Sequence, residues 1–382
     1  MWFPRLAICC AGVLTLASAA WAEETNVAAL TQALNSNSAD ERQAAAMQLG
    51  ELGPQALEAA PALIAALDDD DPGVFEAASK ALGRMGPKVV PPLIEALVSD
   101  RSQVCVGAAL SLSLIGPDAA PAVKPLIVVV QEGDLDSRRA AIAALRGIGP
   151  TAKAAVPALL KATAADDFHT QYLACTALEA IGPEAKPAAP RMRELLETGL
   201  PSVRVHAALA LGGIGPEIGE AGLASLIAAL KDRSHNVREA AAVALGRLGK
   251  TAQPAVVELK AALKQQRIDS RVAAVEALWK ITGDADDVLP RLVAEVAGED
   301  DPEKAAELLA GLGPIAKPAV PKLIALLKSD ETLTRMNVAY GLGRLGPLAA
   351  DAVPALGKLN DDPDPFVRNA AEQAIEQITK QP

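Results

Sequence analysis

Aromatic residues are nearly missing from this sequence. They make up 2% of its 382 residues, although 51% of the residues are apolar. A core without aromatic bulk has to be filled by Ala, Leu, Val and Ile, which suits closely packed helices. Basic residues are also too few to balance the acidic ones, and the net charge is −11. Nucleic acids and anionic lipids select a basic surface, so we expect neither as a partner.

Long apolar runs are absent beyond the N-terminus. Residues 6–16 form an apolar stretch that follows a positive charge at Arg5 and precedes the small-residue site Ala20-Trp21-Ala22. The stretch is too short to span a membrane comfortably. This pattern predicts a signal peptide over residues 1–22, cleaved after Ala22. Residues 23–382 are then expected to be secreted or periplasmic, with no membrane insertion.

Cysteine is scarce, with four residues in the chain. Cys9 and Cys10 lie in the predicted signal peptide, and lipid attachment there is the less favoured alternative because Ile8 fits a lipoprotein signal poorly. Cys105 and Cys175 lie two repeats apart by the period described below, about 20 Å if stacked helices are about 10 Å apart. A disulfide needs Cα atoms within about 7 Å. We therefore expect two buried free thiols.

One fixed period dominates what the sequence does contain. The dipeptide Gly-Pro recurs at 53–54, 86–87, 116–117, 149–150, 182–183, 215–216, 313–314 and 346–347. Most spacings are 33 residues, and one gap of 98 residues holds two degenerate copies that end near Gly249 and Gly283. With a last copy ending near Lys380, the sequence has eleven units of about 33 residues. Such self-similarity predicts a solenoid whose repeats pack on their neighbours.

Each unit predicts two helices, as residues 216–249 illustrate. Residues 223–231 form a first helix, residues 232–236 a polar turn, and residues 237–248 a second helix with one apolar stripe at the helical period. A Gly at the end of the second helix can adopt the left-handed conformation, and the following Pro cannot continue the helix. Five units place a Pro at the start of the first helix: Pro61, Pro157, Pro254, Pro321 and Pro354.

The consensus P-x-L-I-x-A-L, then D, then V-R-x-x-A-A-x-A-L-G-x-[IL]-G, resembles a HEAT repeat over about residues 25–380. More narrowly, it is similar to the short HEAT-like repeat named after phycobilisome lyases. The resemblance implies an all-α fold, a right-handed α-solenoid (armadillo/HEAT-like superhelix) of about eleven two-helix repeats. Residues 23–382 would form one domain with polar capping repeats at both ends. The ninth unit, residues 284–313, departs most, as a local bend or as a short repeat whose helix begins with Pro302.

HEAT families also place an Arg after the first core position of the second helix, where it typically pairs with a turn Asp along the solenoid. Seven units have this Arg: Arg42, Arg138, Arg204, Arg238, Arg271, Arg335 and Arg368. Candidate partners in the turns are Asp100, Asp136, Asp232, Asp269 and Asp330. A functional basic stripe is the rival interpretation, which the net negative charge disfavours. The four departures from this column are Phe75, Cys105, Gln171 and Pro302.

One stretch, A-L-G-R-L-G-K-T at residues 244–251, fits a relaxed form of the phosphate-binding loop. A loop of that kind follows a strand and opens a helix. Here residues 244–248 are predicted to end a helix, and a helix C-terminus repels phosphate. The same pattern recurs at 81–87 and 341–347. We therefore interpret it as a repeat ending.

No other motif predicts catalysis. The run of four Asp at 68–71 lacks the spacing of a calcium loop, and we interpret it as a solvated acidic turn in which Asp71 caps the next helix. His169, His206 and His235 fall in different repeat columns, in units about 10 Å apart, too far for one zinc ion. We expect no metal, no cofactor and no enzyme activity.

Without a catalytic motif, the surface of the solenoid is the remaining candidate for function. In HEAT-type solenoids the second helices line the concave side, where the positions two, three and six residues after the first core residue should face a partner. These positions are mainly apolar in units three to seven and more polar in units one, two and nine. Exposed apolar patches mark interaction sites, unless tight curvature buries them against neighbouring helices. The candidate partner-binding residues are Val106, Leu110, Tyr172, Leu173, Thr176, Val205, His206, Leu209 and Val243.

These observations favour a non-catalytic scaffold, exported from the cytoplasm, that binds a protein or peptide through its concave surface. The resemblance to lyase repeats implies a second hypothesis, a bilin lyase-like enzyme subunit, which the predicted signal peptide disfavours. A third is an architectural role through self-association in the cell envelope.

Overall fold

The computed structural model describes residues 27–263, 268–298 and 302–380, except for the side chains of residues 268–272 and 285–287. Throughout these ranges the regular elements are helices, and no strand occurs. The chain divides into two compact units, Met1–Ala188 and Ala189–Pro382. The predicted signal peptide and the side chains of Arg271 and Asp269 lie outside the described residues.

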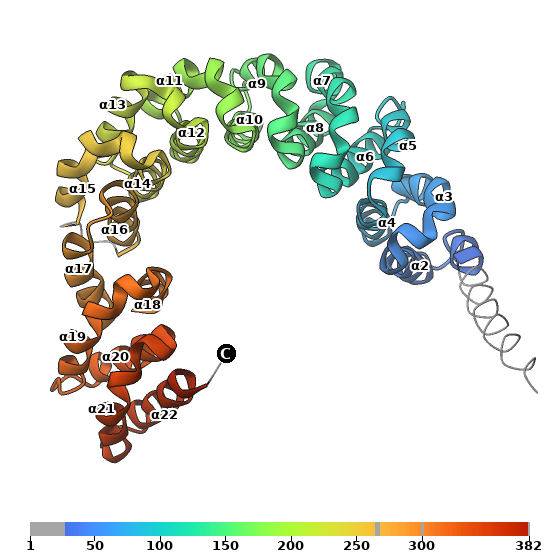
Figure 1. Cartoon of the computed structure of the whole chain (residues 1–382). Coiled ribbons are helices and arrows are strands. Elements are labelled where there is room, and N and C mark those ends of the chain that lie inside the picture. The colour runs from blue at the N-terminus through green and yellow to red at the C-terminus, as the bar shows by residue number, and fades with distance from the viewer. Residues whose placement is uncertain (1–26, 264–267, 299–301, 381–382) are drawn as a thin grey trace, which may run out of the picture. The chain divides into compact units, whose positions relative to one another are not determined.

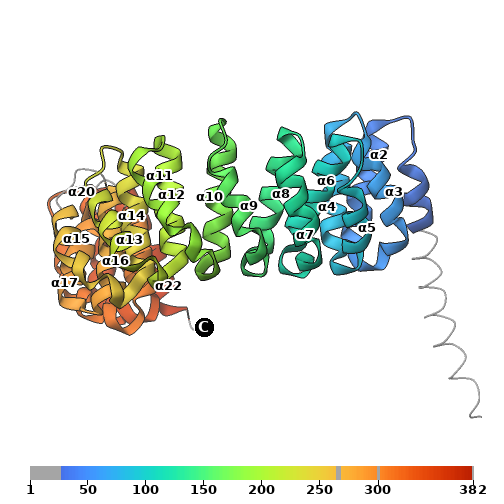
Figure 2. The ribbon, with the colours of Figure 1, turned by 90° about the horizontal axis from the view of Figure 1, so that it is seen from above.

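Unit 1 stacks its two-helix repeats in two rows (Figure 1). The first helices of the repeats form one row: α3 (Ala60–Ala65), α5 (Val90–Ala96), α7 (Val123–Glu132) and α9 (Val156–Ala162). The second helices form the other: α2 (Ala39–Leu52), α4 (Pro72–Met85), α6 (Ser102–Ile115), α8 (Leu135–Ile148) and α10 (Phe168–Ile181). Each first helix packs on the second helix that follows it, and α6, α8 and α10 stand side by side (Figure 2).

Unit 2 repeats the pattern. Its first helices are α11 (Ala189–Thr198), α13 (Gly219–Ala229), α15 (Val256–Ala262), α17 (Ala285–Ala297), α19 (Val320–Leu326) and α21 (Val353–Gly357). Its second helices are α12 (Pro201–Ile214), α14 (His235–Leu248), α16 (Ile268–Thr282), α18 (Pro302–Gly311), α20 (Thr332–Leu345) and α22 (Pro365–Thr379). In the ninth unit α18 begins at Pro302 and has 10 residues, against 14 in α14, so the short-repeat interpretation is confirmed. The predicted α-solenoid class is also confirmed.

The glycines that end the second helices differ in one respect from the prediction. Gly249 has the expected positive φ of 55°, but its ψ is −135°. This is not the left-handed helical conformation; it is close to a region that is essentially restricted to Gly. The same sign of φ occurs at Gly53, Gly86, Gly116, Gly149, Gly182, Gly215, Gly283, Gly313 and Gly346.

Where the sequence predicted only a break, short 3-10 helices follow all of these glycines except Gly283. They are η1 (Gly53–Ala59), η3 (Pro87–Val89), η4 (Gly116–Ala122), η5 (Gly149–Ala155), η6 (Gly182–Ala188), η7 (Gly215–Ile218), η8 (Gly249–Ala255), η9 (Gly313–Ala319) and η10 (Gly346–Ala352); η2 (Ala66–Asp68) and η11 (Lys358–Asp361) instead end first helices. Pro61, Pro157, Pro321 and Pro354 start first helices as predicted. The prediction for Pro254 was wrong: it lies inside η8, and α15 begins after it, at Val256.

The core contains Ala and Leu in place of aromatic rings. Leu49, Leu82, Leu112 and Leu145 have no exposed surface, and small Ala side chains between them let neighbouring helices approach closely. Among the described residues, every aromatic side chain is half-buried or exposed. The aromatic side chains that the structure describes therefore all reach the surface.

Ser102–Glu132 is apolar and long enough to cross a membrane by length and composition, with a mean hydropathy of 1.4. The chain does not run straight through it. Gly116, with a φ of 73°, ends α6, and η4 then leads into α7. The two α-helices have 14 and 10 residues, and each is shorter than the about 20 residues that a span requires.

Candidate partner-binding groove

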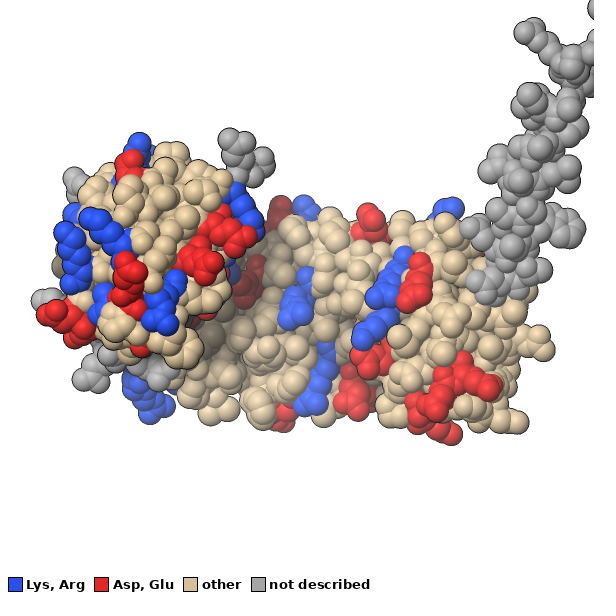
Figure 3. All heavy atoms as spheres, turned by 90° about the horizontal axis from the view of Figure 1, so that it is seen from below, with Lys and Arg blue, Asp and Glu red and all other residues tan. Residues whose placement is uncertain are grey.

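The second helices of four consecutive repeats in unit 1 line a groove of about 750 Å³. Its apolar lining comes from α4, α6, α8 and α10: Phe75, Val106, Leu110, Ala140, Ala143 and Leu173. Its polar lining comes largely from the turns and helix starts: Asp69, Asp70, Ser102, Gln103, Asp136, Arg139 and His169. In Figure 3 the surface of unit 1, at the right, is mainly uncharged and carries both acidic and basic side chains, with most of the acidic ones toward its lower edge.

Helical spacing explains why α6 presents apolar side chains to the groove. Val106 and Leu110 are four residues apart, so they lie on one face of the helix. Val104, Ala108 and Leu112 lie on another face and are buried in the repeat stack. Val106 and Leu110 are left half-buried. The alternative that curvature buries the apolar positions is therefore wrong for these two.

Phe75 lines the groove, although the sequence did not predict it as a site residue. It occupies the α4 position where most units carry the repeated Arg, and its side chain is half-buried. A Cβ atom at Gly107 would lie 3.0 Å from Cε2 of Phe75 and 2.7 Å from Cδ2 of Leu67. Gly107 therefore makes room for the Phe75 ring against α6. The sequence did contain a signal for this residue, because Phe75 replaces the Arg that most repeats have at the same position.

Asp69, which lines the groove, forms hydrogen bonds with residues of two neighbouring helices. Its carboxylate accepts hydrogen bonds from Nε and Nη2 of Arg42 at 2.6 and 2.7 Å, and from the backbone N–H of Asp71 at 3.0 Å. The hydrogen bond from Arg42 lowers the pKa of Asp69, against the opposing effect of burial. Nε2 of Gln103 donates to the Asp69 carbonyl oxygen at 2.7 Å. The turn before α4 is thus fixed to α2 and α6.

The run of four Asp is not the uniformly solvated turn that the sequence predicted. Besides Asp69, the carboxylate of Asp68 forms an ion pair with Arg101. Asp71 caps α4 as predicted and accepts from the N–H of Gly73 at 2.8 Å. Asp70 is exposed. The repeat stack therefore uses three of these carboxylates, and Asp70 faces solvent at the groove.

Arg139, on α8, is the basic residue that lines the groove. Its Nη2 donates to Oδ1 of Asp167 at 2.7 Å, and its Nη1 lies 4.0 Å from Oδ1 of Asp136. Burial raises the pKa of Asp167, but hydrogen bonds from Arg139 and Thr170 outweigh this and lower the pKa to about 2. The side chain of Asp136 is 78% exposed. Asp136 therefore keeps most of its solvation, whereas Asp167 is held in the fold.

Three of the predicted ladder arginines each join two neighbouring repeats. Arg204, only 3% exposed, donates to both carboxylate oxygens of Asp232 at 2.8 and 3.1 Å and to the Gly199 carbonyl oxygen at 3.0 Å. Arg335 does the same with Asp362, at 2.8 and 3.0 Å. Arg42 and Asp69 form the third pair. Each Arg thereby fixes the turn of its own repeat to the turn of the next.

Other ladder residues bind backbone. Arg138 donates to the carbonyl oxygens of Val130 and Gly133, both at 3.1 Å, and Arg368 donates to that of Asp362 at 2.7 Å. Arg238 donates to the Asp232 carbonyl oxygen at 2.9 Å. The carboxylate partners in the three pairs are Asp69, Asp232 and Asp362, of which the sequence predicted only Asp232. Asp330 instead accepts from Arg335 through its carbonyl oxygen, at 3.1 Å.

The remaining candidate residues do not line this groove. On α10, Tyr172 is half-buried, with its ring 5.8 Å from that of His169. Thr176 is buried, and its hydroxyl donates to the Leu173 carbonyl oxygen at 2.8 Å. The other four belong to unit 2 and are half-buried there: Val205, His206, Leu209 and Val243. The structure therefore brings together Val106, Leu110 and Leu173.

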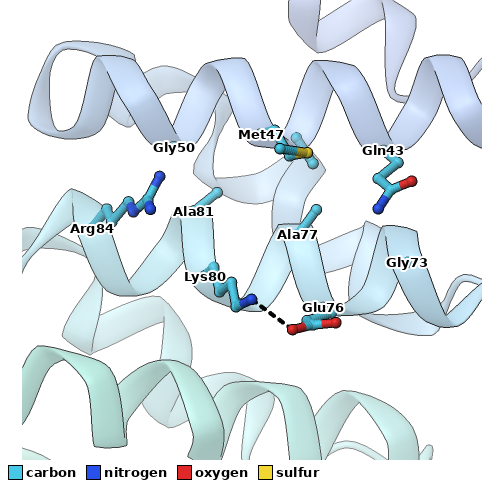
Figure 4. A pocket seen from close by; sticks show the side chains of 10 residues that line it. Gln43, Met47, Gly50, Gly73, Glu76, Ala77, Lys80, Ala81 and Arg84 are labelled. Atoms are coloured by element: carbon cyan, nitrogen blue, oxygen red, sulfur yellow. Dashed lines mark hydrogen bonds and ion pairs between the residues drawn. The ribbon is translucent and has the colours of Figure 1, made fainter. Parts of the chain in front are cut away.

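A smaller, polar pocket of about 240 Å³ lies between α2 and α4. Gln43, Glu76, Lys80 and Arg84 line it together with Met47 (Figure 4). Lys80 Nζ is 2.5 Å from Glu76 Oε1. The polar character predicted for the first two units is thus confirmed at this pocket.

The other motifs have structural roles. Residues 244–248 end α14, and the hydroxyl of Thr251 donates to the Leu248 carbonyl oxygen at 2.7 Å, so the stretch 244–251 is a repeat ending as predicted. Cys105 and Cys175 are buried free thiols, also as predicted. No group of three His, Cys, Asp or Glu residues suited to a metal ion occurs in the part of the chain that the structure describes.

A family model of HEAT repeats matches residues 27–114, 189–279 and 289–376. The chain belongs to the HEAT-repeat family. The matched spans cover more than half of it and fall in both units. They carry no sign of the narrower phycobilisome-lyase type, which rests on the consensus alone. No curated protein matches the sequence.

Solved structures share the fold at low sequence identity. One described as the Kap95:Nup1 complex aligns with a TM-score of 0.58 and 15% identity, over 92% of this chain and 56% of that chain. Kap121p aligns with a TM-score of 0.48 and 14% identity, over 93% and 45%. An engineered protein aligns with a TM-score of 0.45 and 22% identity, over 93% and 99%. These likenesses concern the fold only.

Proposed function

We propose that this HEAT-repeat protein is a non-catalytic scaffold that binds a segment of another protein in the groove of unit 1. The observation that carries the proposal is the groove itself, which has an apolar floor built from four consecutive second helices. Half-buried Val106, Leu110 and Leu173 offer apolar area that the fold does not use. Covering such area is what drives most protein association.

Two further observations support a binding role. The proposal needs no catalytic group, and two of the charged side chains that line the groove, Asp69 and Arg139, are occupied in ion pairs between repeats. The fold neighbour described as the Kap95:Nup1 complex is a solenoid of this class in complex with another protein. The sequence pattern of residues 1–22 supports export, so the partner would be an envelope or secreted protein.

Site-specific crosslinking in the producing cells tests the proposal. A photoreactive amino acid at Leu110 lies in the groove, whereas one at Val128 lies on α7, in the other helix row, where Val128 is 48% exposed. We expect one discrete crosslinked polypeptide from position 110 and none from position 128. Equal crosslinking at both positions, or none at position 110, refutes the groove as the binding site. Crosslinking of the chain to itself would favour an architectural role instead.

A further inference from the structure

The charges around the groove do not cancel. Its lining contains three carboxylates, Asp69, Asp70 and Asp136, against a single cation, Arg139. Asp69 and Arg139 already pair with groups outside the lining. Asp70 and Asp136 are exposed beside the apolar floor, in the turn before α4 and in the first turn of α8, and Asp136 has only a 4.0 Å contact with Arg139. Two solvated carboxylates therefore remain for a ligand, with no free cation among the described lining residues to oppose them.

The floor beside these carboxylates suits side chains that are apolar along their length. Val106, Leu110 and Leu173 offer aliphatic contact, and Phe75 offers the face or edge of a ring. Lys and Arg place their methylene stems on such surfaces while the charged head stays in solvent, and either head group can also bind an aromatic face. An acidic segment would be repelled by the exposed carboxylates and by a chain with a net charge of −11.

We infer that the segment bound in the groove is cationic and aliphatic, with Lys or Arg heads at Asp70 and Asp136 and aliphatic side chains on the floor beside them. This inference rests on the proposed function. Four helices at spacings of about 8–10 Å span roughly 24–30 Å, and an extended chain covers about 3.3–3.6 Å per residue. The groove therefore accommodates about eight residues of extended peptide.

Defined peptides test this inference. Three labelled octapeptides are titrated with the purified full chain at low and high salt: alternating Lys and Leu, alternating Glu and Leu, and alternating Lys and Ser. We expect the Lys-Leu peptide to bind at least about tenfold more tightly than either of the others, and more weakly at high salt. Equal binding of the Glu-Leu peptide refutes the charge preference. Equal binding of the Lys-Ser peptide refutes the role of the apolar floor.

Matched variants locate the effect. The double variant Asp70→Asn and Asp136→Asn should weaken Lys-Leu binding about threefold to tenfold, the range of two exposed ion pairs. The control is Asp118→Asn with Glu132→Gln, two exposed positions in η4 and α7 that change the net charge equally. An equal loss in both double variants refutes the groove as the source. If no peptide binds while position 110 still crosslinks to a partner, this inference is wrong and the proposed function stands; if both fail, the proposed function fails.

Discussion

Removing the charge of Arg204 is the sharpest test of how neighbouring repeats are joined. In Arg204→Met, the Asp232 carboxylate loses both of its Arg204 hydrogen bonds, and the Gly199 carbonyl oxygen loses a donor. Breaking a buried ion pair from one side costs about 3–5 kcal/mol. The Asp232 side chain is 17% exposed and keeps the N–H of Ser234 at 2.7 Å. We therefore expect a smaller loss, about 2–3 kcal/mol.

The loss should be local, because each repeat contacts only its neighbours. Urea unfolding gives the overall effect, and hydrogen exchange of the turns at residues 199–201 and 230–235 shows where the stack opens. The matched control is Arg344→Met, whose pair with Glu307 at 3.0 Å has side chains 42% and 52% exposed; it should cost less than about 1 kcal/mol.

A double-mutant cycle separates the pair from its parts. Asp232→Asn leaves Arg204 as a buried charge with a neutral partner, so it should also destabilise the chain. The double variant should lower the free energy of unfolding by less than the sum of the two single variants, because it leaves no buried charge without a charged partner. If Arg204→Met costs no more than the exposed control, or if the two changes add, the repeats are not joined in this way.

Three further predictions follow from single positions. Gly249→Ala should lower the free energy of unfolding by about 1–3 kcal/mol, because φ 55° and ψ −135° suit only Gly; an unchanged urea midpoint would contradict this. The pKa of Asp134 is lowered to about 2 by hydrogen bonds from the start of α8, and that of Asp167 to about 2 despite burial. Their stabilisation should be complete above about pH 4 and lost as the pH falls toward 2, which circular dichroism along an acid titration can follow. Cys105 and Cys175 should react with a thiol reagent only after unfolding, since both are buried; rapid labelling of the native chain would be inconsistent with the stack.

The fold was predictable because one signal repeats. A Gly-Pro period with an apolar stripe at helical spacing gives helix type, number and order from the chain alone. The conformation at the repeat ends was not predictable in the same detail. Pro254 illustrates this, because a Pro is acceptable both within a short 3-10 helix and at the first position of an α-helix. The first helices α9 and α15 both begin directly after a seven-residue 3-10 helix, so Pro157 falls just inside its helix and Pro254 just before its own.

The candidate site was predictable in part. The column positions of Val106, Leu110 and Leu173 indicated which face of each second helix they occupy. The ion pairs of the charged residues around the groove depend on the geometry of the turns, which cannot be read from a residue's position within the repeat. In unit 1, Arg138 donates to carbonyl oxygens of its own repeat, and its neighbour Arg139 contacts the next turn. Arg204 follows a turn of the same length but pairs with Asp232.

Stability and binding have separate physical origins in this chain. The stack is held by fully buried Ala and Leu side chains and by Arg–Asp pairs that join one turn to the next. None of the described aromatic side chains is buried in it. The ring of Phe75 is half-buried, with room for it against α6 at Gly107, and it lies where the groove begins. Because the core is filled by small residues, the part of this ring that stays accessible adds nothing to core volume and is open to the proposed partner.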